Sequence, residues 1–240
     1  MATSYDIAGR TITLPVRVRD ASAATVLFEV DAAAAAGLVP GDAFEIVETG
    51  PGRAHLAIVL VDYRDNDLGA YHEVGLTFFV RPRAGGEDGT FITRLPVDQP
   101  FTCEAGRTIW GFPKTVEQID VESTATGSAW TLRMDGQPVL TLRVPRGGTD
   151  ETPPAPMTAY SLIDGVPHAT TFTQGGQGSQ LVFGGEGVEV TLGTHPISRE
   201  LARLGLPAAP VVLSTWLERM QATFGEAVPL KAPADTSGPH

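Results

Sequence analysis

Lysine is nearly missing from this chain of 240 residues, because only two of its 17 basic residues are lysines and the rest are arginines. Lys114 ends the run Gly106-Arg-Thr-Ile-Trp-Gly-Phe-Pro-Lys114, and Lys231 opens the last ten residues. Only a lysine amine can lose its proton and attack a carbonyl carbon, since a guanidinium stays charged. A coding bias toward arginine also explains the shortage. The composition therefore leaves two readings of Lys114, a reactive amine and an inert cation.

Cysteine is equally scarce, and the single Cys103 excludes an internal disulfide and a thiolate metal cluster. We expect Cys103 to be a half-buried strand residue in the run Pro100-Phe-Thr-Cys-Glu104. The five histidines lack the pairwise spacing of metal ligands, and His72-Glu73 is not followed by the second histidine of a zinc-binding helix. We therefore expect no metal site. His195, in Gly-Thr-His-Pro, is interpreted as a turn residue before a helix.

Positive charge is in deficit, with a net charge of −11 and an isoelectric point near 4.8. An acidic surface makes nucleic acid and anionic membranes unfavourable partners. No apolar run reaches the length of a membrane span, and the N-terminal residues have no apolar signal core. We expect a soluble, cytoplasmic protein.

Short segments of alternating polar and apolar residues dominate the chain, separated by many of its 27 glycines and 19 prolines. This period is typical of strands with one buried face. An Asp-Gly pair within Met134–Pro138 indicates a hairpin turn, and a second turn is indicated at Phe183–Gly187. We predict a mostly antiparallel β architecture, closed or nearly closed into a barrel or cone. The expected strands are Thr25–Val30, Ala54–Tyr63, Glu73–Val80, Ala129–Met134, Pro138–Val144 and Val188–Leu192.

Few segments have the signals of a helix. Asp31–Gly37 combines an N-terminal Asp with a C-terminal Gly, and Pro196–Gly205 begins on Pro and ends on Gly. Ser214–Phe224 fits either a helix or a strand. We expect two or three short helices outside the barrel.

The chain is predicted to form one domain over residues 1–230, followed by a flexible tail over 231–240. The Gly- and Pro-rich segment 147–156 is expected to be a loop that joins two β-rich halves, because such clusters interrupt strands. Gln174–Gln180 is rich in glycine but lacks the lysine of a phosphate-binding loop, so we interpret it as a flexible loop.

Glu73 is a candidate partner for Lys114. If Tyr71–Gly75 is extended, Tyr71, Glu73 and Gly75 share one face, and His72 and Val74 share the other. A carboxylate that points inward is costly unless it is paired. An outward Glu73 at the end of a strand is the alternative.

The run from Gly106 to Lys114 resembles the acetoacetate decarboxylase superfamily. That family carries a Gly-Arg-Glu-aromatic/aliphatic-Gly/Ala-aromatic-Pro-Lys segment whose lysine forms a Schiff base. Tyr71-His-Glu73 is similar to the family's Tyr-x-Glu segment, and residues 28–40 are similar to its N-terminal strand, short helix and Leu-Pro corner. The likeness covers about residues 15–225.

The resemblance implies an acetoacetate decarboxylase-like barrel or cone, a homo-oligomer, and Lys114 and Glu73 as catalytic residues. It implies that Tyr71, Trp110 and Phe112 contact the substrate. Arg19, with Arg17 as the alternative, is the nearest match to the family's active-site arginine. Members that decarboxylate acetoacetate carry a second lysine directly after the first, and Thr115 stands at that position here.

The implied chemistry needs neither a metal nor an organic cofactor. A neutral Lys114 amine attacks the ketone of a small keto acid and forms a protonated imine, which accepts the electron pair of a breaking carbon–carbon bond. Since Thr115 supplies no charge, we expect burial beside Trp110, Phe112 and Pro113 to lower the pKa of Lys114. Three functions remain open: a β-keto acid decarboxylase, a pyruvate-type aldolase-dehydratase or cyclase, and a non-catalytic ligand-binding β protein with Lys114 as an electrostatic anchor.

Overall fold

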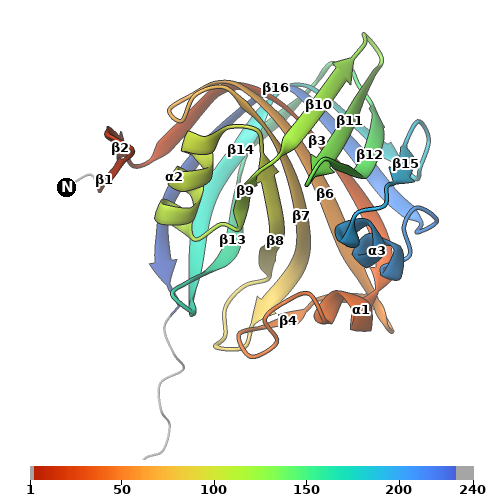
Figure 1. The fold of residues 1–240 in the computed structure, drawn as a ribbon, viewed down its shortest axis with the longest axis horizontal. Helices are drawn as coiled ribbons and strands as arrows, with labels where there is room; N and C mark the ends of the chain where they lie inside the picture. Colours follow the sequence, from red (N-terminus) through yellow and green to blue (C-terminus); the bar gives the residue numbers. More distant parts are fainter. Residues whose placement is uncertain (1–2, 231–240) are drawn as a thin grey trace, which may run out of the picture.

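Seven long strands form a closed barrel in the computed structural model, which describes residues 3–230 (Figure 1). Pairing between β7 and β8 closes the ring, and all neighbours are antiparallel except β13 and β8. The tail predicted for residues 231–240 lies outside the described residues. In ring order the strands are β7 (Tyr71–Pro82), β6 (Arg53–Asn66), β3 (Val16–Asp31), β16 (Val211–Pro229), β14 (Val166–Phe183), β13 (Asp150–Ile163) and β8 (Gly89–Val97).

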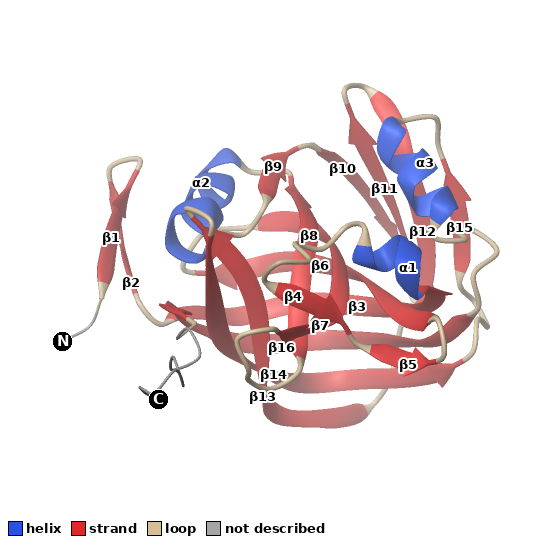
Figure 2. Cartoon of the chain, turned by 90° about the horizontal axis from the view of Figure 1, so that it is seen from below, coloured by secondary structure: helices blue, strands red, loops and turns tan. Residues whose placement is uncertain are grey.

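Shorter strands extend the ring. β4 (Phe44–Ile46) pairs with β7, β5 (Glu48–Gly50) pairs with β6, and β9 (Lys114–Val116) pairs with β8. A hairpin of β1 (Ser4–Ile7) and β2 (Arg10–Thr13) stands beside the helix α2 (Pro100–Trp110), apart from the barrel (Figure 2).

A second sheet of four strands lies against the outside of the barrel (Figure 1). It contains β10 (Gln118–Ser123), β11 (Gly127–Met134), β12 (Gln137–Pro145) and β15 (Glu189–Leu192). Two further helices, α1 (Ala32–Ala36) and α3 (Pro196–Arg203), lie on this side of the molecule. None of the described helices is long and apolar enough to cross a membrane. The prediction of a mostly antiparallel barrel with short outer helices is confirmed.

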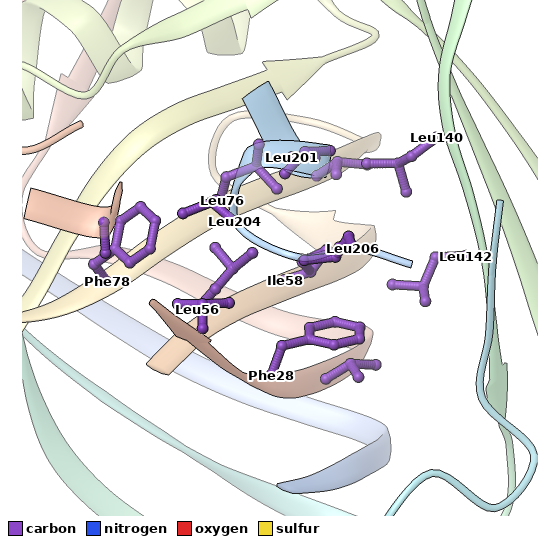
Figure 3. Close-up of a cluster of buried hydrophobic side chains, with 14 of the residues drawn as sticks. Phe28, Leu56, Ile58, Leu76, Phe78, Leu140, Leu142, Leu201, Leu204 and Leu206 are labelled. Carbon is purple, nitrogen blue, oxygen red and sulfur yellow. The ribbon is translucent and has the colours of Figure 1, made fainter. Parts of the chain in front are cut away.

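The main hydrophobic core lies between the barrel wall and the second sheet. Leu140 and Leu142 of β12 and Leu201 of α3 approach the outward side chains of β3, β6 and β7 (Figure 3). Alternation along β6 places Ile58 in this core and Val59 in the lumen of the barrel. The wall formed by β6 and β7 is thus covered outside by a packed core, and its inner face is free to build a site.

Leu142→Ala is expected to lower the free energy of unfolding by about 2–5 kcal/mol, because Leu142 is fully buried between the second sheet and the barrel. Chemical denaturation measures the loss. Arg143→Ala, at the exposed neighbouring position of the same strand, is the matched control and should change stability by less than about 0.5 kcal/mol. Equal effects of the two substitutions would contradict this packing.

Most of the predicted elements are present. All six expected strands lie within or overlap observed strands, and Asp135 and Gly136 form the predicted hairpin turn, both with positive φ. Asp31 accepts a hydrogen bond from the Ala34 amide at the start of α1, and His195 caps α3 in the same way. The ambiguous segment Ser214–Phe224 is part of strand β16.

The loop predicted over residues 147–156 is wrong, because β13 begins at Asp150. Pro153 and Pro154 fall where the register with β14 shifts, between the pairs of Thr152 and Ala155. A proline that cannot donate to a ladder is tolerated at such a bulge. The two β-rich parts are therefore joined by a paired strand.

The flexible loop predicted over Gln174–Gln180 is also wrong, since the segment lies inside β14. A Cβ at Gly176 would lie 2.1 Å from the Arg219 carbonyl oxygen, and one at Gly175 would lie 2.6 Å from the Pro154 nitrogen. The glycines allow close approach of β14 to its neighbouring strands, rather than disorder.

Cys103 is buried in α2 and is not a strand residue. The helix begins with Pro100 behind the capping side chain of Gln99, whose oxygen accepts a hydrogen bond from the Thr102 amide. Gln99 is not a usual cap and Gly106 interrupts the helical pattern, so sequence signals for α2 were weak.

Candidate active site

Lys114 and Glu73 form a buried ion pair at one end of the barrel lumen. The Lys114 Nζ lies 2.8 Å from the Glu73 Oε2, and the two residues are 4% and 9% exposed. The amine also donates hydrogen bonds to the Thr102 Oγ1 at 3.1 Å and to the Tyr71 hydroxyl at 3.4 Å. Glu73 therefore faces inward, and the alternative of an outward carboxylate is excluded.

Two stacked tyrosines lie beside the ion pair, and one of them is bonded to the carboxylate. The Tyr63 hydroxyl donates to the Glu73 Oε1 at 3.2 Å, and the Tyr63 and Tyr71 rings stack with centroids 4.4 Å apart. Burial raises the pKa of both phenols, and the negative charge of Glu73 raises both further, although the positive charge of Lys114 opposes the rise at Tyr71. Tyr63 therefore remains a neutral donor to one carboxylate oxygen near neutral pH, and Lys114 is the partner of the other.

The alternation of side chains along β7 turns Glu73 into the lumen. Tyr71, Glu73 and Gly75 of β7 line the lumen, while Val74 packs in the outer core and the His72 ring lies against Trp130. This is the alternation predicted from the sequence.

The turn at the C-terminal end of α2 determines the position of Lys114. Gly111 takes a left-handed conformation, with φ of +64°, and its amide bonds back to the Arg107 and Gly106 carbonyls. A Cβ there would lie 2.6 Å from the Ile163 side chain. A glycine at this cap lets the chain turn sharply, so that β9 starts at Lys114 and its side chain returns toward the helix.

Gly106 makes room for the lysine side chain. A Cβ at this helical position would lie 2.6 Å from the Lys114 Cδ and 2.7 Å from its Cε. The alkyl chain therefore lies directly across the backbone of α2, on its way to Thr102 and Glu73.

Gly106→Ala should displace the Lys114 amine and lower the rate of any reaction at it by at least about tenfold, as misplaced reacting groups do. The fold should remain, because alanine favours a helix by about 1 kcal/mol over glycine. Steady-state rates and thermal melting test the two statements. Thr108→Ala, at an exposed position of the same helix, is the control. Wild-type rates in Gly106→Ala would show that the amine needs no such packing.

The charge state of Lys114 differs from the sequence expectation. Burial does oppose the ammonium form, as predicted, but the nearby Glu73 carboxylate and hydrogen bonds to Glu73 and Tyr71 outweigh it. The pKa of Lys114 is therefore raised above its ordinary value, and the resting site holds an ammonium–carboxylate pair. The prediction that burial lowers the pKa of Lys114 is wrong, because it did not include the negative charge of the Glu73 carboxylate.

A cavity of about 650 Å³ extends from this pair through the lumen. Tyr71, Trp110 and Phe112, predicted to contact a substrate, all line it together with Lys114 and Glu73. The Trp110 and Phe112 rings stack at 5.7 Å, and the Trp110 Nε1 donates to the Gly225 carbonyl oxygen. This stacking and this hydrogen bond hold the Trp110 and Phe112 rings in place beside the Lys114 amine.

Comparison with known protein families identifies the family of this chain. The family model described as acetoacetate decarboxylase matches residues 5–229. This chain belongs to the acetoacetate decarboxylase family. A search among curated proteins found no match.

Several solved structures have the same fold at low identity. An acetoacetate decarboxylase from Legionella pneumophila is 17% identical, with a TM-score of 0.65 over 90% of this chain and 87% of that one. The enduracididine biosynthesis enzyme MppR, in complex with pyruvate, is 15% identical, with a TM-score of 0.63 over 91% of both chains. An acetoacetate decarboxylase-like enzyme from Sphingomonas wittichii is 14% identical, with a TM-score of 0.56 over 93% of this chain and 96% of that one.

The arginine inferred from the family resemblance does not reach the cavity. Alternation along β3 turns Val16 and Val18 into the lumen and Arg17 and Arg19 outward. The Arg19 guanidinium lies on the surface, 2.8 Å from Asp65 and 2.6 Å from Asp67. Its assignment as a substrate-binding residue is corrected here, because a one-residue offset on a strand reverses the face.

Two site residues were missed by sequence reasoning. Tyr63 ends the predicted strand Ala54–Tyr63, and its place on the inner face follows from the same alternation that selects Val59 and Val61. Thr102 had no signal, since its segment was interpreted as a strand. Across residues 3–230, no group of three or more His, Cys, Asp and Glu side chains is arranged to hold a metal ion.

Proposed function

We propose that this family member is a carbon–carbon lyase that acts on a carbonyl compound through an imine of Lys114. The observation that carries the proposal is the buried pair of Lys114 and Glu73, 2.8 Å apart, at the end of a cavity large enough for a small molecule. A primary amine beside a proton acceptor in a desolvated cavity is the arrangement that imine formation requires.

Glu73 has the role of a proton carrier in this proposal. It takes a proton from the Lys114 ammonium across their hydrogen bond, which leaves a neutral amine and a neutral carboxyl group. The amine nitrogen then attacks the carbonyl carbon. Glu73 returns its proton to the oxygen, which leaves as water after a second proton from nitrogen reaches it. The nitrogen keeps one proton, so the product is a protonated imine with a positive charge.

The protonated imine then acts as an electron acceptor. In a retro-aldol reaction the hydroxyl group of a β-hydroxy ketone gives its proton to Glu73, the carbon–carbon bond breaks, and its electron pair moves toward nitrogen as an enamine. An aldehyde departs. The enamine carbon takes the proton back, and water hydrolyses the imine to release the ketone. Decarboxylation would use the same acceptor, with CO2 as the departing group.

Aldol-type chemistry is favoured over decarboxylation by the charges of the cavity. Within the described part of the chain, no arginine or second lysine lines it, and Thr115 is exposed. A β-keto acid would have no cation besides Lys114 to hold its carboxylate. One related structure is MppR complexed with the condensation product of pyruvate and imidazole 4-carboxaldehyde, 17% identical with a TM-score of 0.52.

Reductive trapping tests the proposal. The protein is incubated with acetoacetate, pyruvate and a set of neutral ketones, borohydride is added, and the intact mass is measured. A reduced adduct mapped to Lys114 is the expected result for at least one compound. Absence of an adduct on Lys114 with every compound would favour the non-catalytic alternative, in which Lys114 is an electrostatic anchor.

A homo-oligomer in the cytoplasm remains our expectation from the family resemblance. Light scattering at micromolar concentration should give a mass that is a multiple of the 25.3 kDa chain. Several exposed apolar side chains, including Phe183 at 75% exposure and Leu181 at 53%, are consistent with a buried contact in such an assembly. A mass of one chain would contradict it.

A further inference from the structure

We propose that the cavity selects a neutral, elongated apolar ketone or aldehyde, and that a carboxylate on the substrate weakens binding. The inference rests on the proposed imine chemistry of Lys114 and names the substrate class for it. It departs from the small keto acid expected from the sequence, and it follows from the charge, the shape and the walls of the lumen.

The charge of the lumen is the first observation. Among the described residues, its lining contains one cationic side chain, Lys114, and three acidic ones, Glu73, Glu87 and Asp88. Glu87 and Asp88 are exposed and belong to the turn that joins β7 to β8, at the end of β7 away from Glu73. Two guanidinium groups lie at this turn, and each has an acidic partner: Arg81 pairs with Asp88 at 2.7 Å and Arg83 with Glu45 at 3.5 Å. An entering anion therefore meets acidic groups and no unpaired cation.

The ion pair leaves no positive charge to spare for a substrate. Glu73 balances the Lys114 ammonium before the reaction and balances the protonated imine after it. A substrate carboxylate in the lumen would be a third charge without a counterion, and burial of an unpaired charge is strongly unfavourable. A neutral carbonyl compound carries no such penalty, so the site favours it at both stages.

The shape of the lumen is the second observation. Tyr71, Glu73, Gly75, Thr77 and Phe79 all line it from one strand. Glu73 and Phe79 are six positions apart, which corresponds to about 20 Å along an extended strand. A cavity of about 650 Å³ with the reactive amine at one end fits a long molecule that enters with its carbonyl group first. Pyruvate or acetoacetate would fill only a small part of it.

The walls are the third observation. Small barrels are commonly filled by their inward side chains, but here small residues at inward positions, such as Ala57, Gly75 and Ala159, leave the lumen open. Larger apolar side chains cover much of the remaining surface. Those beyond the immediate surroundings of the amine are Val18, Val59, Phe79, Ile92, Phe172 and Phe224. Apolar walls over this length stabilise an alkyl chain, since each buried methylene adds about fourfold to affinity.

Two matched pairs of carbonyl compounds test charge and length separately. Acetone and pyruvate form the short pair, and methyl octyl ketone and α-ketodecanoate form the long one; within each pair a methyl group is replaced by a carboxylate. The measured quantity is the initial rate of cyanoborohydride-trapped adduct on Lys114 of the intact wild-type protein. Each rate is divided by the rate of Nα-acetyl-lysine with the same compound, which removes differences in intrinsic reactivity.

The normalised trapping rate of methyl octyl ketone should be at least about tenfold higher than that of α-ketodecanoate and that of acetone. A tenfold difference corresponds to about 1.4 kcal/mol. Ala57→Trp should lower the preference for the long ketone over acetone, because a bulky side chain would block the lumen about 13 Å along β6 from Val61, the partner of Glu73. If this variant does not fold, the four wild-type rates decide alone.

The outcomes separate this inference from the function beneath it. A keto acid that equals or exceeds its neutral partner would overturn the inference and leave the imine chemistry intact. Equal ratios for acetone and methyl octyl ketone would also overturn it, because the lumen would then add nothing. No adduct on Lys114 with any of the four compounds would reject the imine chemistry itself, and the inference with it.

Discussion

Lys114→Arg should abolish turnover and reductive trapping together. Arginine keeps a positive charge beside Glu73 but supplies no nucleophilic amine, so a catalytic lysine and an electrostatic anchor give opposite results. We expect a loss of at least about 1,000-fold, comparable with the loss of other covalent nucleophiles. An anchor would tolerate the change and retain ligand binding. Turnover, intact mass and ligand affinity of the same preparation separate the two cases.

The chain provides its own control for this experiment. Lys231 carries the only other side-chain amine, so Lys231→Arg makes the same chemical change elsewhere and should leave trapping at the wild-type level. The space along Gly106 that holds the lysine methylenes is narrow. If a guanidinium does not fit there, Lys114→Met offers a side chain of similar length without an amine. An adduct that persists in either Lys114 variant would reject Lys114 as the nucleophile.

Glu73→Gln should lower turnover and shift the pH dependence of imine formation toward lower pH. In the wild-type protein Glu73 outweighs burial and raises the pKa of Lys114. Glutamine removes that negative charge, so that burial acts without it and lowers the pKa. The free amine then appears at lower pH, but the proton carrier is lost. The initial rate of cyanoborohydride trapping, followed against pH, should show both effects.

The ion pair of Lys114 and Glu73 also determines how the stability of the protein depends on pH. Because the folded pKa of Lys114 is raised, the pair stabilises the wild-type protein up to about pH 10 and this contribution is lost as the pH rises through the raised value. Glu73→Gln should remove it at neutral pH. The cost should stay below the roughly 3–5 kcal/mol of an unpaired buried charge, since Lys114 can release its proton.

Tyr63→Phe is the matched control for Glu73→Gln. It removes the hydrogen bond to the Glu73 Oε1 but keeps the carboxylate, so the pH profile should move much less than in Glu73→Gln. Identical profiles for the wild type and Glu73→Gln would show that Glu73 does not govern the protonation of Lys114.

The amino-acid sequence alone determined the fold class and the two central residues of the site. Alternating apolar positions predict strands whatever their neighbours are, and the same period placed Tyr71, Glu73 and Gly75 on one face. The scarcity of lysine and the family-like run before it singled out Lys114. These features are local, so they can be read before any contact is known.

Only the tertiary structure decided what depends on neighbours distant in the sequence. The glycines of Gln174–Gln180 predict a loop from the sequence alone. In the structure they are strand residues, and they allow the backbones of Arg219 and Pro154 to approach closely. The outward direction of Arg19 depends on the register of β3, which an approximate alignment cannot resolve to one residue. Thr102 reaches Lys114 only because α2 ends in a sharp turn at Gly111.

The charge state of the amine is the clearest case. Desolvation could be anticipated from the apolar residues before Lys114, but the opposing attraction needs a carboxylate 2.8 Å away that lies 41 positions earlier in the chain. Electrostatic energy depends on distance and burial, which the fold sets and the sequence order does not. The sequence thus identified Lys114 and Glu73, and the packing of the barrel determined their protonation and the mostly apolar lumen beside them.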